Sequence, residues 1–214
     1  MRTRLALLPA VVLGVWCVTG NVNTQVVLAP LAATSPITYF IEEGTPESAY
    51  RPGDRQLAVW ALEAWARNSD GMLRFEPADA RDATIRVSWV PASDGRYGEM
   101  VPTTVNGRQG ATVYIRPDTN FLGPDIASIA RDDALLRDTI VYLTCLHELG
   151  HALGLPHTSA YLDIMYFFGY GGDIPGFFRR YRDRLSARAD IANVSGLSAN
   201  DISRLRALYP VVAR

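Results

Sequence analysis

All three histidines of this 214-residue chain lie in one short segment, His147-Glu-Leu-Gly-His-Ala-Leu-Gly-Leu-Pro-His157. On a helix, His147 and His151 stand one turn apart on the same face, where two imidazoles can bind one metal ion. Gly154 has no Cβ and tolerates a positive φ, so the backbone can turn back and bring His157 to the same ion. Three imidazoles and an open fourth position are typical of catalytic zinc sites.

Glu148 follows the first histidine and lies about 100° further around the helix axis. This places its carboxylate near the metal without making it a ligand, and we interpret it as a general base. A bare His-Glu-x-x-His pattern is only moderately specific, whereas its extension to Gly154 and His157 is much more so. The alternative of three structural histidines bonded to backbone carbonyls has to explain why no other histidine occurs in the chain.

Composition and periodicity predict one domain of mixed α and β structure. A hydrophobic content of 48% with 20% charged residues is ordinary for a globular protein, and the length allows one sizeable core. The expected strands are 37–41, 73–75, 84–90 and 111–115. Segment 97–104 fits only at a sheet edge, because Pro102 cannot donate a hydrogen bond to a neighbouring strand.

Three helices are expected from the spacing of apolar residues. The first carries a stripe from Leu57 to Trp65, with Asp54 as its N-cap. The second is a buried helix over 132–153, which Gly154 ends in a left-handed conformation. The third covers 202–209 and is opened by a capping box at 198–201.

The N-terminus has the layout of a secretory signal peptide, with Arg2 and Arg4 before an apolar stretch too short to span a membrane comfortably. We expect a leader over 1–20, whose cleavage site is uncertain, and a linker over 21–35. The protein is then secreted or periplasmic. An uncleaved leader would instead tether it to a membrane.

Charge and cysteine content constrain the partners. The net charge of −1 gives no reason to expect nucleic acid or an anionic membrane surface, and we expect a monomer acting on a protein or peptide. Cys145 is the only cysteine left once the leader is removed, so no disulfide within the chain is expected. It precedes His147 by two positions, which on a helix directs it away from the histidine face.

The histidine segment, together with Asp163-Ile-Met165-Tyr166, resembles the metzincin clan of metalloproteases and, within it, the matrixin family. The strand at 37–41 resembles the first strand of that family, and 197–209 resembles its C-terminal helix. The resemblance covers about residues 36–210. In the family the methionine, here Met165, lies beneath the metal as a hydrophobic base.

This resemblance implies a twisted, mostly parallel five-stranded sheet with one antiparallel edge strand and three helices. The catalytic domain would span 36–214, with a cleft between an upper subdomain over 36–157 and a lower subdomain over 158–214. It further implies a zinc-dependent endopeptidase with one zinc ion on the three histidines.

The resemblance also implies a substrate site. A peptide would pair with the edge strand 97–104 at Gly98, Glu99, Met100 and Val101. The pocket for the side chain after the scissile bond would be walled by aromatic residues that follow the methionine: Tyr166, Phe167, Phe168 and Tyr170.

Two other functions are alternatives to a matrixin-like endopeptidase. A catalytically silent zinc-binding module of the same fold would have lost the base, and Glu148 is present. An astacin- or serralysin-like protease would carry a tyrosine ligand two residues after the methionine, where this chain has Phe167.

The sequence departs from the matrixin pattern in three places. The stretch between leader and first strand has no room for a propeptide with a cysteine switch. Asn200 stands where the family has the first of two aspartates. Loop ligands for a structural zinc or calcium are not recognisable over 92–120, where Asp94 and Asp118 could be isolated calcium ligands but fit ordinary turn residues better.

An insertion precedes the last helix, and it has amphipathic spacing. Phe177, Tyr181 and Leu185 share one face, and arginines occupy the others. The aromatics could shape the substrate pocket while Arg179 and Arg180 select acidic substrates. Alternatively the helix packs its aromatics on the lower subdomain, which is the interpretation that we favour.

Overall fold

The alternation of buried and partly exposed residues along the strands shows which face of the sheet meets the helices. In β3 (Ile85–Trp89), the first, third and fifth residues are buried and those between them are partly exposed. The computed structural model describes residues 29–95 and 97–211. The other strands are β1 (Ile37–Ile41), β2 (Phe75–Pro77), β4 (Gly98–Val105) and β5 (Arg108–Ile115).

The strands form one sheet in the order β2-β1-β3-β5-β4. All neighbouring pairs are parallel except β4 and β5, which are antiparallel and joined by a turn at Asn106 and Gly107. Both turn residues have positive φ, as a tight hairpin turn requires. Pro102 lies in β4 opposite Ala111, at the edge of the sheet. The predicted five-stranded, mostly parallel sheet with an antiparallel edge strand is confirmed.

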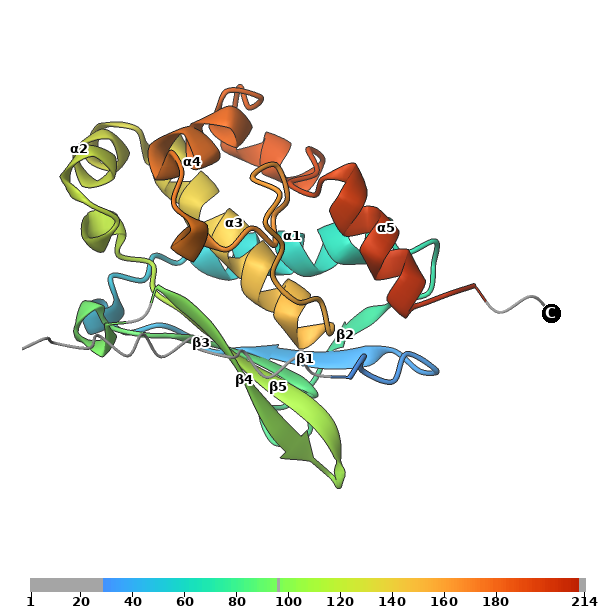
Figure 1. The fold of residues 1–214 in the computed structure, drawn as a ribbon. Helices are drawn as coiled ribbons and strands as arrows, with labels where there is room; N and C mark the ends of the chain where they lie inside the picture. Colours follow the sequence, from blue (N-terminus) through green and yellow to red (C-terminus); the bar gives the residue numbers. More distant parts are fainter. Residues whose placement is uncertain (1–28, 96, 212–214) are drawn as a thin grey trace, which may run out of the picture.

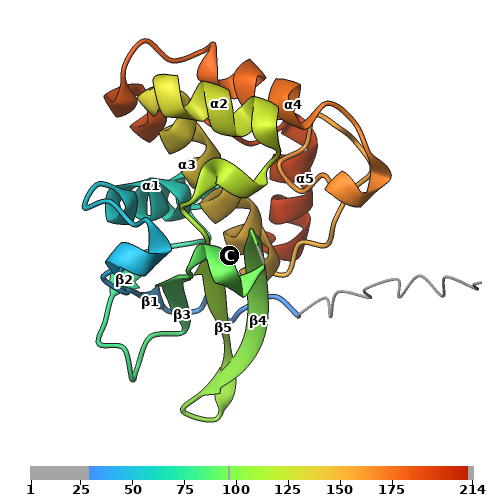
Figure 2. The same cartoon turned by 90° about the vertical axis from the view of Figure 1, so that its left-hand side faces the viewer.

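In the described part of the chain, five α-helices lie on one side of this sheet (Figures 1 and 2). They are α1 (Asp54–Arg67), α2 (Pro124–Asp132), α3 (Ala134–Ala152), α4 (Ile174–Arg182) and α5 (Ala199–Leu208). Helix α3 packs across β4 and β5 and against α1, and thus runs through the centre of the core. The three helices implied by the family resemblance are α1, α3 and α5, and α2 and α4 are additional.

The prediction of one continuous helix from Asp132 was wrong at its start. Asp132 ends α2, and the next residue, Asp133, is the N-cap of α3, where its carboxylate accepts a hydrogen bond from the Leu136 amide at 3.0 Å. Helix α2 was missed because it begins with Pro124 directly after Gly123, a start signal that apolar spacing alone does not show.

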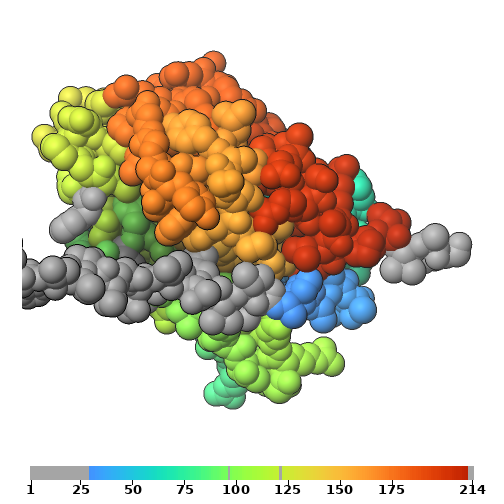
Figure 3. All heavy atoms as spheres, viewed as in Figure 1, coloured from blue at the N-terminus to red at the C-terminus, as the bar shows by residue number. Residues whose placement is uncertain are grey.

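The last helix is longer than expected, beginning at Ala199. The predicted capping box is present: the Ser198 hydroxyl accepts from the Asp201 amide at 3.0 Å, and the Asp201 carboxylate accepts from the Ser198 amide at 2.9 Å. At its other end, the Tyr209 hydroxyl accepts from the amide of Leu31 and donates to the carbonyl of Leu153. The described start of the chain therefore lies against α5 (Figure 3).

The leader prediction falls on residues 1–20, which lie outside the described residues. Within residues 29–95 and 97–211, no helix combines the length and apolar character needed to cross a membrane.

The sequence suggested Asp54 as the N-cap of α1, and this prediction was wrong. Gly53 holds that position, and Asp54 is the first helical residue, with a side chain that is 1% exposed. Its carboxylate accepts two hydrogen bonds from the guanidinium of Arg137 in α3, and this side chain is 3% exposed. Arg137 also contacts Asp138, which in turn accepts from Arg188 at 2.7 Å. This network of charges joins α1, α3 and the insertion.

Replacing Arg137 with alanine should lower the free energy of unfolding by about 3–5 kcal/mol, because it leaves the Asp54 carboxylate buried without its partner. Urea unfolding of the variant and wild type measures the difference. Arg67→Ala is the control: that arginine makes an exposed ion pair with Glu63 one turn away, and its loss should cost less than about 1 kcal/mol. Equal losses in the two variants would contradict a stabilising role for the buried pair.

Candidate metal centre

The end of α3 determines where the third histidine lies. The Gly154 amide donates to the carbonyl of His151, and the Leu155 amide donates to that of Gly150, both at 2.9 Å. Gly154 has a φ of 97°, as expected from the sequence. This pair of bonds is a Schellman motif, which ends the helix and reverses the chain. The reversal directs His157 back toward the histidines of the last two turns of α3.

The three imidazoles converge through their Nε2 atoms. His157 Nε2 lies 3.2 Å from His147 Nε2 and 3.1 Å from His151 Nε2. The opposite nitrogens of the two helical histidines face carbonyls: His147 Nδ1 lies 2.6 Å from the Ile164 oxygen, and His151 Nδ1 lies 2.8 Å from that of Leu155. A carbonyl can only accept, so both Nδ1 atoms carry hydrogen and their Nε2 atoms present lone pairs.

This arrangement fits a bound cation. Because His147 and His151 offer lone pairs, the only hydrogen available among the three Nε2 atoms is one on His157, which cannot satisfy both neighbours. Burial lowers the pKa of all three rings, to about 3 for His151 and about 4 for His157. The rings are therefore neutral near pH 7, and neutral imidazole is the form that binds a metal ion. Among the described residues, this is the one group of three histidine, cysteine or acidic side chains close enough to share an ion.

Glu148 lies beside this centre with a carboxylate that is 6% exposed. The Met100 amide of β4 donates to it, but within residues 29–95 and 97–211 its Oε2 atom has no hydrogen-bond partner. Burial is the main reason that the pKa of Glu148 is raised to about 8, and the negative charge of Glu99 contributes to the same shift. A cation on the imidazoles would oppose this shift by favouring the ionised carboxylate.

Strand β4 passes directly over Glu148, and Gly98 makes this approach possible. A Cβ at Gly98 would lie 2.6 Å from Glu148 Oε1 and 2.9 Å from Thr144 Cγ2. Both distances are shorter than normal van der Waals contacts, so any side chain at this position would displace the carboxylate. The edge strand and the carboxylate are therefore placed relative to each other by a glycine.

Met165 lies against the histidine helix at Gly150. It is fully buried, and a Cβ at Gly150 would overlap its sulfur, so the helix and the methionine meet at a glycine. The preceding residue, Ile164, supplies the carbonyl that faces His147, and its own amide donates to the Asp201 carboxylate at 2.8 Å. The N-terminus of α5 thus holds the peptide that orients a histidine.

The side-chain amide of Asn200 has a hydrogen-bond partner that explains why an asparagine stands at this position. Its Nδ2 donates to the Asp163 carboxylate at 2.6 Å, and the Ser198 hydroxyl donates to the other oxygen of the same group. Asp163 is 2% exposed. An aspartate at position 200 would place a second carboxylate against it, whereas the amide supplies a neutral donor.

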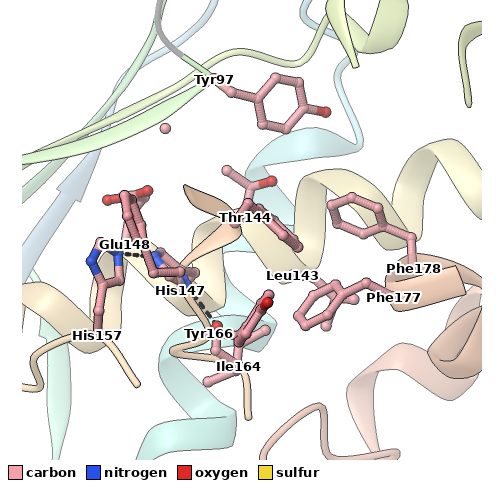
Figure 4. Close-up of a pocket in the computed structure, with 13 residues that line it drawn as sticks. Tyr97, Leu143, Thr144, His147, Glu148, His157, Ile164, Tyr166, Phe177 and Phe178 are labelled. Atoms are coloured by element: carbon pink, nitrogen blue, oxygen red, sulfur yellow. Dashed lines mark hydrogen bonds between the residues drawn. The ribbon is translucent and has the colours of Figure 1, made fainter. Parts of the chain in front are cut away.

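A cavity of about 220 Å³ extends from the imidazoles to α4 (Figure 4). His147, His157 and Glu148 lie at one end, and the rings of Phe177 and Phe178 lie at the other. Of the predicted substrate residues, the structure brings Gly98, Tyr166, Phe167 and Phe168 to the cavity wall, but not Glu99, Met100, Val101 or Tyr170.

Sequence reasoning missed four residues that line this cavity, namely Tyr97, Leu143, Thr144 and Ile164. Leu143 and Thr144 precede His147 by four and three positions, so helical spacing alone could have placed them on its face. Tyr97 and Ile164 carried no comparable signal, because only the fold brings the start of β4 and the methionine loop to this helix face.

Helix α4 packs its aromatic residues in the core and also places two of them at the cavity. Phe177, Phe178 and Tyr181 are buried in the core, as in the interpretation that we favoured, and the two phenylalanines also line the cavity. Arg180 donates to the carbonyls of Tyr161 and Leu162, and its guanidinium lies 4.1 Å from the centre of the Phe177 ring. Its side chain therefore braces the loop before the methionine.

Cys145 and Asp118 have the surroundings that the sequence indicated. Cys145 is fully buried, and burial raises the pKa of its thiol. Asp118 caps a short turn by accepting from the amide and side chain of Asn120, which is the role of an ordinary turn residue.

The sequence profile of the family described as Matrixin matches residues 32–172, more than half of the chain. The chain belongs to the matrixin family. The resemblance seen in its sequence is thereby confirmed, and the histidine segment, Glu148 and Met165 all lie within the matched region.

Individual relatives share only low sequence identity with this matrixin. Macrophage metalloelastase of Oryctolagus cuniculus is 29% identical over 181 residues, which are 81% of this chain but 32% of that protein. The chain thus spans about a third of the length of this relative. Two solved structures of myroilysin align at 18% identity with TM-scores of 0.41 and 0.42. These alignments cover 86% and 85% of this chain, and 86% and 82% of theirs.

From the three converging imidazoles, we expect that the chain, once stripped of metal, takes up one zinc ion and becomes more stable. Ligand in thousandfold excess over Kd should add about 4 kcal/mol, seen as a rise in Tm. His151→Ala should abolish the shift, whereas Cys145→Ala should retain it, because the thiol lies in the core and away from the imidazoles. Stoichiometry is checked by metal analysis, and a zinc-dependent shift that survives in His151→Ala would show that the ion binds elsewhere.

Proposed function

We propose that this matrixin is a zinc-dependent endopeptidase that hydrolyses peptide bonds in proteins or peptides. The observation that carries the proposal is the convergence of three Nε2 atoms beside a buried carboxylate, at the mouth of a cavity bordered by an edge strand. Membership of the matrixin family supports a metalloprotease activity.

The chain would hold one zinc ion on His147, His151 and His157. A zinc ion bound there would lower the pKa of a water molecule and polarise the scissile carbonyl. Glu148 would take a proton from the attacking water and then deliver it to the departing amine. Its Oε2 atom, which has no hydrogen-bond partner among the residues that the structure describes, is the position for that proton.

The substrate would lie along β4. Among the described strands, none lies beyond the outer edge of β4, so an extended peptide could pair with its main chain over Gly98, Glu99, Met100 and Val101. The side chain after the scissile bond would enter the cavity. Its walls are largely apolar and aromatic, contributed by Leu143, Ile164, Tyr166, Phe168 and Phe177 among others, which favours a large apolar side chain.

We propose a leader over 1–20, a linker over 21–35 and a catalytic domain over 36–214, whose cleft separates 36–157 from 158–214. The protein would then act outside the cytoplasm.

Glu148→Gln should retain zinc and fold but lose turnover by about 10²- to 10⁴-fold, because the amide cannot accept the proton of the attacking water. Hydrolysis of a casein or peptide library measures this, together with metal analysis of the same sample. Glu63→Gln, on an exposed part of α1, is the control and should leave turnover unchanged. Substantial cleavage by the pure Gln variant would remove Glu148 from the reaction, and chelator-resistant cleavage by wild type would exclude the zinc mechanism.

Gly98→Ala should lower kcat by about 10- to 100-fold while leaving zinc content unchanged, because the added Cβ pushes the Glu148 carboxylate out of place. Steady-state kinetics on one peptide measure the effect. Thr104→Ala, at an exposed position of the same strand, is the matched control. A Gly98→Ala variant with the kcat of wild type would show that the carboxylate tolerates the displacement.

A further inference from the structure

The three histidines are not held in the same way. His147 and His151 each have a carbonyl within 2.8 Å of Nδ1, whereas Nδ1 of His157 has no hydrogen-bond partner among the residues that the structure describes. Histidines that bind metals are normally oriented by such a bond, and its loss weakens binding of the metal. The ring of His157 lacks such a carbonyl and has a different neighbour.

Phe167 is that neighbour. Its ring stacks on the imidazole of His157 with a centroid separation of 4.7 Å and an angle of 30° between the planes. Two backbone hydrogen bonds set this register: the Thr158 amide donates to Met165, and the Phe167 amide donates to Thr158, at 2.8 and 3.1 Å. Because residues 158 and 165–167 are bonded side by side, the two rings face each other.

The far side of the Phe167 ring is also defined. Tyr170 meets it edge-on, with centroids 5.4 Å apart and planes at 90°. A Cβ at Gly169 would overlap the Phe167 ring, so the absence of a side chain there leaves room for the stacked orientation. Yet Phe167 is 40% exposed, which is unusual for a large apolar side chain whose role is only to fill the core.

We propose that Phe167 is a positioning residue for the metal centre, which holds the imidazole of His157 by stacking where the other two histidines are held by carbonyls. This inference rests on the proposed zinc site. A stacked aromatic pair of this kind is worth roughly 2- to 10-fold in an equilibrium constant. The stack should therefore contribute that factor to zinc affinity.

The test is zinc affinity at fixed pH, measured by competition with a chromophoric chelator. Phe167→Leu keeps an apolar side chain but removes the flat ring. Gly169→Ala keeps Phe167, but the added Cβ displaces its ring from the stack on His157. Both should weaken zinc binding by roughly 2- to 10-fold, with the Tm of the metal-free protein little changed. Tyr170→Phe keeps the stack and should bind zinc like wild type.

The outcomes separate this inference from the proposed function. If wild type binds no zinc, both fail together. If wild type binds zinc and Phe167→Leu binds it equally well, the zinc site stands and the positioning role is wrong. Should the leucine variant fail to fold, Gly169→Ala decides the matter alone, and wild-type affinity in that variant would equally overturn the role.

Discussion

Helix α3 is buried along most of its length, so almost every side chain that it carries must be matched by a particular neighbour. At its start, Arg137 is matched by the carboxylate of Asp54. Near its end, the Leu146 carbonyl accepts from the indole of Trp65, and Gly150 leaves room for the sulfur of Met165. A helix fixed on these sides holds its two histidines and Glu148 at fixed spacing, and His147 and Glu148 line the cavity.

The metal centre is connected to the rest of the chain by hydrogen bonds rather than by the histidine helix alone. Ser198 and Asp201 cap α5, and the Asp201 carboxylate also accepts from the amide of Ile164. The carbonyl of Ile164 in turn orients the imidazole of His147. A carboxylate that opens one helix therefore determines the orientation of an imidazole on another. Burial raises the pKa of Asp201, so this position is sensitive to the loss of its partners.

Much of the fold followed from local chemistry. Strands β1, β3 and β5 were predicted close to where they lie, whereas β2 begins at Phe75, the last residue of the predicted 73–75. The edge position of 98–105 followed from Pro102, which cannot serve an interior strand. Two features were misjudged where local signals conflicted. Asp54 has the chemistry of an N-cap, but the need to neutralise Arg137, 83 positions away, takes priority. Helix α2 was missed, and its last residue, Asp132, was assigned to the helix that follows.

By itself, the sequence determined the histidine spacing, the turn at Gly154 and the position of Glu148, because these depend on contacts within a dozen residues of one helix and its end. Only the tertiary structure decided what surrounds them. The carbonyl of Ile164, the main chain at Gly98 and the rings of Phe177 and Phe178 come from three other parts of the chain. No local preference encodes such meetings, since they arise from packing a whole sheet and its helices into one core.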